Sequence, residues 1–381
     1  MESKIYLDHA ATTPLDAEVL QKMLPYFTEV YGNADSPHGI GRKAMNAVDG
    51  ARDTMAEWIG AKPSEVYFTS GGTEADNWAL RGGAYAQKAK GKTGIVVSSI
   101  EHHAVLETAK ELEKEGFFVT YLPVNDGGRV ALNDLAAAID ENTGVVAIMM
   151  ANNETGVVHP IKKMAALAHE KGALFFTDAV QAAPYMPLNV RDLGVDMLSF
   201  SAHKFYGPKG CGVLYVKSGV KIERLVVGGE QERGLRGGTV NVPSVVGLAA
   251  AYSKNAATMY ELNKKIASLR DLFLSEISSL DGVYKNGEGE DVLPSVLNLR
   301  FDGVKNEDFL YNMDLKGICV AAGSACASAS VKPSHVLTAM GLTEDEARSS
   351  VRFSFGKNNT EEEIRFAAKA TVEIVNRLRK F

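Results

Sequence analysis

The sequence has few cysteines, no long apolar run and no excess of positive charge. Its three cysteines form no CxxC pair, so neither a disulfide framework nor a thiolate zinc site is expected. The formal net charge of −6 argues against a broad surface for nucleic acid. The longest apolar runs, such as residues 145–150, are too short to cross a bilayer, and the first residues resemble neither a secretion signal nor a transit peptide. We therefore expect a cytoplasmic protein without a metal site that acts on a small molecule or a protein.

Short apolar strands alternate with amphipathic helices over most of the 381 residues. This alternation predicts parallel βαβ units with helices on both faces of a sheet. We expect residues 15–255 to form one large α/β domain. The later pattern predicts a smaller α+β domain over residues 256–381, joined by residues 1–14. No Pro/Ser-rich linker separates the two domains, so they should pack closely and share a site at their cleft.

One cysteine has unusual neighbours. Cys326 lies in AAGSACASAS, residues 321–330, where the side chains are small and show no periodicity. This composition is typical of a mobile loop rather than of a packed element. Cys211 and Cys319 instead lie in apolar stretches that predict strands, and we interpret both as buried packing residues.

Several segments place polar residues where expected strands end, which is where open α/β sheets bind ligands. Gly72 and Thr73 begin a helix and could hold a phosphate, although glycine turns before helices are common. Asp178 could instead be a helix N-cap, and the glycine-rich stretch around Thr239 could be a solvated loop. The other strand-end candidates are His102, His103, Gln181, Ser201, His203 and Lys204.

Taken together, these residues fit one chemistry. Lys204 can bind the aldehyde of pyridoxal phosphate covalently, and Asp178 can keep the ring nitrogen protonated so that the ring withdraws electrons. Glycine, serine and threonine residues can hold the phosphate, and a histidine can stack on the ring. Each residue alone is ambiguous, but their joint occurrence favours a pyridoxal phosphate enzyme.

A series of longer motifs extends over nearly the whole chain. In order, they are YLDHAATTP, FTSGGTEADN, EHHAVL, NNETG, TDAVQ, SAHKFYGPKG, GGEQERGLRGGT, GSACAS and SVRFSFG. With these motifs the sequence resembles the cysteine desulfurases of the NifS/IscS type, which are fold-type I enzymes of the class V aminotransferase group. The resemblance implies a large domain with a mostly parallel sheet that binds pyridoxal 5'-phosphate.

The resemblance also implies roles for the cofactor-binding residues. Lys204 would carry the cofactor, Asp178 would pair with its ring nitrogen, Gln181 would bond its phenolic oxygen and His102 would stack on its ring. The phosphate would be held by Gly72, Thr73, Ser201 and His203, together with Thr239 from the neighbouring subunit of a homodimer.

For the substrate, the resemblance implies that Arg352 and Asn153 bind the carboxylate of L-cysteine, with help from Asn33. Asn153 would also lie beside the cofactor. Lys204 or His102 would remove the α-proton. Cys326 would then accept the sulfur as a persulfide, while the rest of the substrate leaves as L-alanine.

Two other classes of protein remain open at this point. A selenocysteine lyase or an aminotransferase would share Lys204 and Asp178, although an aminotransferase would consume a keto acid and would not need Cys326. A non-catalytic binding protein on the same fold would lack Lys204, Asp178 or Arg352, and the sequence has all three.

The sulfur acceptor is left open by the sequence. AAGSAC and TVNVP depart from common family patterns, and the chain ends at NRLRKF without the extension that some relatives use to dock a scaffold. An iron–sulfur scaffold protein and a tRNA-thiolating enzyme are both compatible, and GGEQER slightly favours the second. We expect no direct contact with nucleic acid and none with a membrane.

Overall fold

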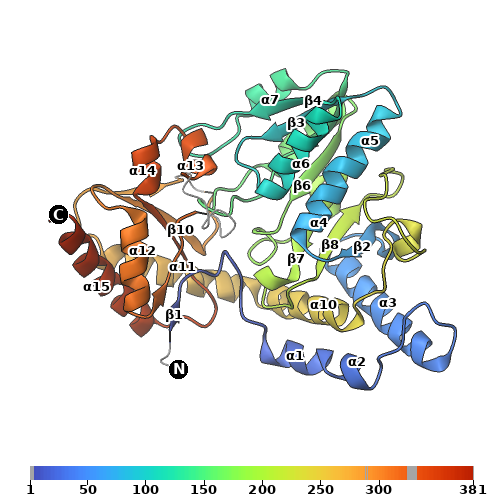
Figure 1. Ribbon diagram of the computed structural model, residues 1–381, viewed down its shortest axis with the longest axis horizontal. Coiled ribbons are helices and arrows are strands. Elements are labelled where there is room, and N and C mark those ends of the chain that lie inside the picture. The colour runs from blue at the N-terminus through green and yellow to red at the C-terminus, as the bar shows by residue number, and fades with distance from the viewer. Residues whose placement is uncertain (1–3, 288, 290, 324–332, 381) are drawn as a thin grey trace.

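The structure is a computed structural model that describes residues 4–287, 289, 291–323 and 333–380. Figure 1 shows a large sheet with helices on both faces and, beside it, a second group of elements drawn in orange and red. The first strand, β1 (Ile5–Tyr6), lies within that second group, because it pairs in parallel with β11 (Ile318–Cys319).

The large sheet has seven strands in the order β2-β8-β7-β6-β5-β3-β4. Its strands are β2 (Val66–Thr69), β3 (Gly94–Ser98), β4 (Phe118–Leu122), β5 (Thr143–Ala147), β6 (Leu174–Asp178), β7 (Met197–Ser201) and β8 (Gly212–Val216). Neighbours from β7 through β6, β5 and β3 to β4 are parallel. Strands β5, β7 and β8 are buried along their whole length, as expected for strands covered on both faces. The expected α/β class is confirmed.

One strand departs from the expected parallel pattern. Strand β8 is antiparallel to both of its neighbours, β2 and β7. The residues that connect β7 to β8 contain only a 3-10 turn, Ala202–Lys204. A parallel partner needs a longer crossover connection, usually a helix, so the chain returns in the opposite direction.

The helices surround both sheets. Their bounds are α1 (Ala17–Met23), α2 (Pro25–Thr28), α3 (Gly39–Ile59), α4 (Gly72–Asn77), α5 (Gly83–Lys88), α6 (His103–Lys114), α7 (Leu132–Ala138), α8 (Ile161–Glu170), α9 (Val190–Leu193), α10 (Val242–Ala257), α11 (Met259–Glu276), α12 (Asn306–Leu315), α13 (His335–Ala339), α14 (Glu344–Arg348) and α15 (Glu361–Leu378). A π-helical turn, Trp78–Gly82, joins α4 to α5. The described residues also form 3-10 turns at Pro63–Glu65, at Ala202–Lys204 and at Glu232–Gly234. Helices α10 and α11 follow each other directly but are separate helices, because the backbone at Thr258 (φ −118°, ψ 10°) leaves the helical conformation.

The second sheet is antiparallel, with the order β12-β10-β9. Its strands are β9 (Val283–Asn286), β10 (Val296–Phe301) and β12 (Ser350–Ser354). The register places Asn298 of β10 opposite Arg352 of β12. Arg352 is therefore the middle residue of β12, an outer strand of this small sheet, and lies beside the central strand β10.

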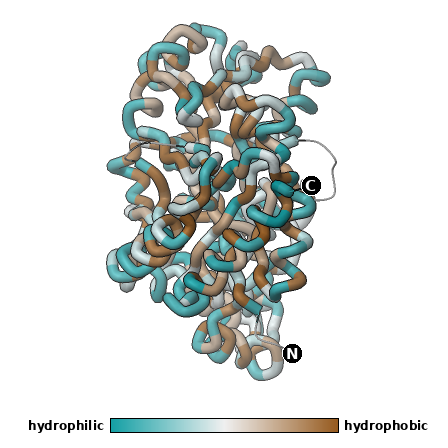
Figure 2. The backbone as a smooth tube through the Cα atoms, turned by 90° about the vertical axis from the view of Figure 1, so that its left-hand side faces the viewer, coloured by the Kyte–Doolittle hydropathy of each residue, from teal (hydrophilic) through white to brown (hydrophobic). Residues whose placement is uncertain are grey.

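The two sheets share one hydrophobic core. A continuous cluster of buried apolar side chains runs from Phe175 on β6 through Tyr252 on α10 and Phe273 on α11 to Phe353 on β12 and Ile374 on α15. In Figure 2, hydrophobic segments pass through the middle of the molecule, and many outer turns are hydrophilic. No helix within the described ranges combines the length and the apolar character that crossing a membrane requires.

Candidate active site

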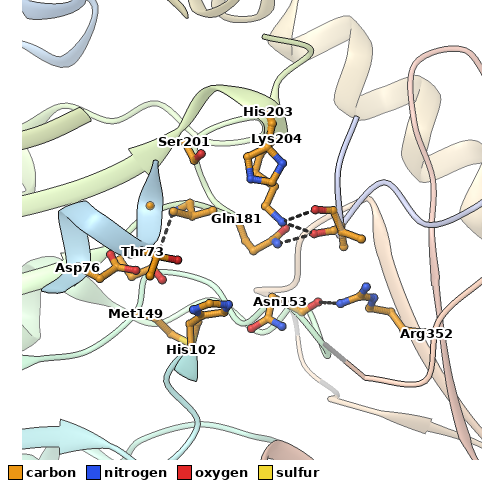
Figure 3. A pocket seen from close by; sticks show the side chains of 15 residues that line it. Thr73, Asp76, His102, Met149, Asn153, Gln181, Ser201, His203, Lys204 and Arg352 are labelled. Atoms are coloured by element: carbon orange, nitrogen blue, oxygen red, sulfur yellow. Dashed lines mark hydrogen bonds between the residues drawn. The ribbon is translucent and has the colours of Figure 1, made fainter. Parts of the chain in front are cut away.

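A cavity opens where the carboxyl ends of β6 and β7 face the N-terminal segment and β12 (Figure 3). Its described lining residues are Ala10, Ala11, Gly72, Thr73, Asp76, His102, Met149, Asn153, Asp178, Val180, Gln181, Ser201, His203, Lys204 and Arg352. The cavity thus brings together most of the residues that the sequence predicts for the site.

Lys204 reaches the cavity from the turn that follows β7. The 3-10 turn Ala202–Lys204 begins directly after the buried strand and directs the lysine side chain inward. Its Nζ donates hydrogen bonds to the carbonyl oxygens of Ala10 at 2.5 Å and Ala11 at 2.9 Å. A primary amine is therefore held by backbone groups at the centre of the cavity.

Asp178 ends β6 on the neighbouring strand. Its side chain is 4% exposed, and its Oδ1 accepts a hydrogen bond from the backbone N–H of Val180 at 2.8 Å. Burial raises the pKa of the Asp178 carboxyl to about 6, and the Val180 N–H and the charge of Lys204 act in the opposite direction. A buried carboxylate that lines this cavity is suited to bind a positively charged group of a ligand.

Asp76 is a site residue that the sequence reasoning missed. It is 1% exposed and accepts a 2.5 Å hydrogen bond from the hydroxyl of Ser199, which lies beside Asp178 in the sheet register. Burial first, and then the charge of Asp178, raise the pKa of Asp76 well above its ordinary value. The spacing in the sequence could have identified Asp76 as a site residue: it follows Thr73 by three residues and so lies on the same face of the helix.

His102 caps the N-terminus of α6 and lines the cavity. Its Nδ1 accepts a hydrogen bond from the backbone N–H of Ala104 at 3.1 Å. Burial, followed by the positive charge of Lys204, lowers the pKa of His102 to about 4, so the ring is neutral at physiological pH. Because Nδ1 is the acceptor, the single ring proton is on Nε2.

Gly72 and Ser201 form one wall of the cavity, beside Thr73 and His203. A Cβ atom at Gly72 would lie only 2.9 Å from Cγ2 of Val180 and 3.7 Å from Cβ of Ser201, so a larger residue would fill this space. Burial, with Lys204 as the second cause, lowers the pKa of His203 to about 3. A neutral His203, two hydroxyl groups and an open glycine backbone are suitable partners for a phosphate.

Arg352 enters the cavity from β12 and is 1% exposed. Its Nη1 donates to the carbonyl oxygen of Asn153 at 2.9 Å, and its Nη2 donates to Oδ1 of Asp8 at 2.9 Å (Figure 3 shows the first bond). Arg352 and Asn153 therefore lie together, as expected if both bind one ligand group, which is the role that the family resemblance implies.

Three predicted residues are not among the described lining residues. Asn33 and Thr239 are exposed, and the Asn33 side chain accepts a hydrogen bond from the backbone N–H of Asp35 at 3.0 Å. Cys326 lies outside the described residues.

The two cysteines interpreted as packing residues differ from each other. Cys211 is 2% exposed and burial raises its pKa to about 12, which confirms that it is a packing residue. The prediction that Cys319 is buried was wrong. It is only partly buried, because β11 is two residues long and its partner, β1, is equally short.

The donor set of the cavity fits pyridoxal phosphate. It offers an amine for the aldehyde, a buried carboxylate for a protonated ring nitrogen, and a glycine, hydroxyl and imidazole wall for the phosphate. In the part of the chain that the structure describes, no group of three or more histidine, cysteine, aspartate or glutamate residues is arranged to hold a metal ion.

The raised pKa of Asp178 gives a prediction for stability. In the folded protein the pKa of the Asp178 carboxyl is about 6, above the ordinary 3.8. The folded protein therefore loses stability as the pH rises through 6, and at pH 8 its free energy of unfolding is lower by up to about 3 kcal/mol. The amide of Asp178→Asn has no charge to desolvate. Cofactor-free Asp178→Asn should therefore be more stable than cofactor-free wild type in urea unfolding at pH 8, with little difference near pH 4. Equal or greater wild-type stability at pH 8 would contradict this assignment.

The family comparison matches most of the chain. The family model "Aminotransferase class-V" matches residues 5–366. A curated relative, "Cysteine desulfurase IscS" of Clostridium botulinum, is 45% identical over 383 residues, which cover 100% of this chain and 96% of that protein.

Solved structures give the same result. A structure titled "NIFS-LIKE PROTEIN" superposes with a TM-score of 0.92 at 39% identity, covering 98% of this chain and 100% of that one. Another, titled "SspA in complex with cysteine", has a TM-score of 0.82 at 36% identity and covers 94% of this chain and 100% of that one.

Proposed function

The chain belongs to the class-V aminotransferase family and, within it, to the cysteine desulfurases of the NifS/IscS type, and we propose that it converts L-cysteine to L-alanine with pyridoxal 5'-phosphate as cofactor. The observation that carries the proposal is the single cavity in which Lys204, Asp178, His102 and Arg352 meet. One of the similar structures, SspA, is in complex with cysteine, which supports the choice of substrate.

The cofactor would be held by the residues that line this cavity. When bound, pyridoxal phosphate supplies an electron sink that makes the α-proton of an amino acid acidic. Asp178 would pair with the ring nitrogen, and Lys204 would bind the aldehyde. Gln181 would donate a hydrogen bond to the phenolic oxygen, and His102 would stack on the ring. The phosphate would be bound by Gly72, Thr73, Ser201 and His203.

Arg352 and Asn153 would bind the substrate carboxylate and so orient the α-carbon toward Lys204. The hydrogen bond from Ala104 to Nδ1 of His102 supports Lys204, rather than His102, as the base that removes the α-proton. A neutral His102 with its proton on Nε2 can donate that proton but cannot accept another at this atom. Lys204 can carry the abstracted proton on Nζ, where the carbonyl oxygens of Ala10 and Ala11 stabilise an ammonium.

Cys326 would take the sulfur of the substrate. Its thiolate would form a bond to that sulfur while the bond from sulfur to Cβ breaks and its electron pair stays with the substrate remnant. The remnant would take up protons at Cβ and at the α-carbon and leave as L-alanine, and the persulfide would stay on Cys326. Gly323, three residues earlier, supports this role: a Cβ at Gly323 would lie 3.2 Å from Oε2 of Glu154, the neighbour of Asn153 in the cavity wall. The chain therefore comes close to the cavity just before Cys326.

The sulfur would pass from Cys326 to an acceptor protein in the cytoplasm. An iron–sulfur scaffold and a tRNA-thiolating enzyme are the two candidate classes, and the GGEQER stretch favours the second. Incubating the enzyme that carries labelled sulfur on Cys326 with each class of acceptor would distinguish them.

One assay tests the proposed reaction. The purified protein, supplied with pyridoxal phosphate, L-cysteine and a thiol but no keto acid, should release alanine and sulfide in equal amounts. Alanine formation that requires a keto acid would instead indicate an aminotransferase. The same assay without any alanine formed would reject the proposed function.

The proposed division into two domains follows the packing of two consecutive helices. Helix α10 packs against α3 and α1 beside the large sheet, whereas α11 packs against α15 beside the small one. We place a large domain at residues 15–255 and a small α+β domain at residues 256–381, with residues 1–14.

A group of exposed apolar side chains supports the proposed homodimer. Exposed apolar side chains gather on the N-terminal helices and the loop that follows them, and include Leu24, Phe27, Tyr31 and Ile40. Asn33 lies within the same stretch. The loop that carries Thr239 is joined to it, because Gln231 donates to the carboxylate of Asp35 at 2.7 Å and accepts from the N–H of Gly238 at 3.0 Å. Thr239, which would bind the phosphate in the partner subunit's site, and Asn33 are therefore both exposed on this connected surface.

Introducing a charge on this face should separate the subunits. Phe27 is 56% exposed, and Phe27→Glu would place a carboxylate in the proposed interface. We expect the wild type to sediment as a dimer. In Phe27→Glu, both the amount of dimer and the activity should fall by at least about tenfold. Phe118, which is 71% exposed on the edge strand β4, provides the control, since Phe118→Glu should change neither. A fully active Phe27→Glu monomer would contradict the shared site.

A further inference from the structure

A carboxylate outside the cavity holds the arginine that the proposed function assigns to the substrate. Asp8 is not among the described lining residues, yet its Oδ1 accepts the 2.9 Å bond from Nη2 of Arg352. The pair is well shielded, with the side chain of Arg352 1% and that of Asp8 20% exposed. The carbonyl oxygen of Asn153 accepts a second hydrogen bond from this guanidinium. Asp8 is thus the charged member of the pair of groups that fix the arginine.

The backbone around Asp8 is fixed to the strand that carries Arg352. Asp8 and Ser354 form a parallel bridge, and the N–H of Ser354 donates to the carbonyl oxygen of Leu7 at 2.8 Å. The hydroxyl of Ser354 in turn accepts the N–H of Ala10 at 2.9 Å. These bonds make the N-terminal segment an extra partner of β12 at the level of Arg352.

The same short segment also contacts the opposite side of the cavity. Ala10 and Ala11 accept hydrogen bonds from Nζ of Lys204, and Ala10 accepts a further one from the side-chain amide of Gln181 at 2.9 Å (Figure 3). Only one residue, His9, separates Asp8 from Ala10 in the chain. Residues 8–11 therefore bond at one end to the arginine and at the other to the lysine.

Thr13 fixes the position of this segment along the Lys204 turn. Its N–H and its hydroxyl both donate to the carbonyl oxygen of His203, at 2.9 Å and 2.8 Å. The hydroxyl oxygen also accepts the N–H of Tyr206 at 2.8 Å. The segment is bonded to the chain on both sides of Lys204 and cannot slide past it without losing these bonds.

We propose that residues 8–11 form a strap that sets the separation of Arg352 from Lys204, and that Asp8 is a positioning residue that acts through Arg352. The inference rests on the proposed function, because it takes the substrate carboxylate as the ligand of Arg352. L-cysteine is small, so its carboxylate and its α-hydrogen must meet the two side chains at one fixed spacing. Displacement of a binding group by about 1 Å is enough to weaken such an alignment.

Removing the carboxylate of Asp8 should weaken substrate binding more than it weakens catalysis. We expect Asp8→Ala to raise the KM for L-cysteine and the inhibition constant of L-alanine by about tenfold or more, with kcat within about threefold. The bound cofactor content should not change, because Asp8 does not line the cavity. Asp8→Asn keeps an oxygen that can accept the hydrogen bond from Arg352. Its KM for L-cysteine and its inhibition constant of L-alanine should therefore lie between those of the wild type and Asp8→Ala. If Asp8→Ala does not fold, Asp8→Asn provides the test.

The matched control lies on the same N-terminal segment. Lys4 forms an ion pair with Asp314 at 3.0 Å, and both side chains are more than half exposed. Lys4→Met should leave KM and the alanine constant within about twofold of the wild type. If Asp8→Ala has a lower melting temperature but an unchanged KM for L-cysteine and an unchanged inhibition constant of L-alanine, the role of Asp8 is merely structural and the proposal is overturned. Tighter binding of either ligand would also overturn it.

One further variant separates this inference from the assignment beneath it. If Arg352→Gln raises the KM for L-cysteine but Asp8→Ala does not, the strap proposal fails while the proposed function stands. If Arg352→Gln leaves the KM unchanged, the carboxylate assignment fails, and the strap proposal fails with it.

Discussion

Lys204→Ala is expected to reduce alanine formation from L-cysteine by at least about a thousandfold. The lysine has two tasks in the proposed reaction, since it binds the aldehyde of the cofactor and removes the α-proton, and a positioned base alone contributes roughly 10²–10⁴-fold. Lys204→Arg should not rescue activity, because a guanidinium stays protonated at any relevant pH. Alanine release measured over hours gives the residual rate.

The control for Lys204 lies five residues further along the same loop. Lys209 is exposed, and Lys209→Ala should keep full activity. A second readout needs no turnover: borohydride reduction of the wild type loaded with pyridoxal phosphate should fix the cofactor on the peptide that contains Lys204. Recovery of the cofactor on another lysine would refute the assignment of Lys204.

Cys326→Ala is expected to lose alanine formation from L-cysteine almost completely while it keeps the cofactor. In the proposed reaction the cofactor and Lys204 activate the substrate, but the sulfur would leave only when a thiolate attacks it. The variant should therefore remain yellow and still change its absorption spectrum when L-cysteine is added. Cys326→Ser should not restore turnover, because a hydroxyl is neither ionised near neutral pH nor reactive enough toward sulfur.

The two other cysteines serve as controls for Cys326. Burial raises the pKa of the Cys211 thiol to about 12, so it is a poor nucleophile, and burial raises the pKa of Cys319 as well. Cys211→Ala should lose stability and keep its activity per folded molecule. Cys319→Ala should keep both. If Cys326→Ala turns over like the wild type and Cys319→Ala does not, Cys319 rather than Cys326 accepts the sulfur.

The sequence predicted the residues whose place follows from strand ends. Lys204 and Asp178 each follow an apolar run, and the carboxyl ends of neighbouring parallel strands meet at one edge of the sheet, so their proximity could be expected. The direction of β8 was not foreseen, because the stretch after Lys204 has the same apolar pattern as a parallel strand. Helix α3, 21 residues long, was not anticipated either.

The contacts of Asp8, Ala10 and Ala11 could not be predicted from local patterns. Ala10 and Ala11 act through backbone oxygens, which every residue has, and their partners, Lys204 and Gln181, lie more than 160 residues away. Asp8 similarly meets Arg352 at a separation of 344 residues. Such pairs depend on how the N-terminal segment crosses between the two sheets, and propensity and periodicity carry no information on that path.

The buried carboxyls around Asp178 explain why this region is costly for the folded chain. Asp76, Glu101 and Asp178 are all at most 4% exposed, and burial raises the pKa of each. Placing several acids in one interior region disfavours their ionisation and reduces stability at neutral pH. A bound cofactor with a protonated ring nitrogen would offset that cost at Asp178, which links cofactor binding to the stability of the protein.

The most direct test of the proposed reaction is the chemical state of Cys326 during turnover. The wild-type protein should be mixed with L-cysteine, quenched with an alkylating reagent and digested for mass spectrometry. We expect one additional sulfur on the peptide that contains Cys326 and none on the peptides of Cys211 and Cys319. Alanine formation without additional sulfur on Cys326, or with that sulfur on Cys319, would contradict the account.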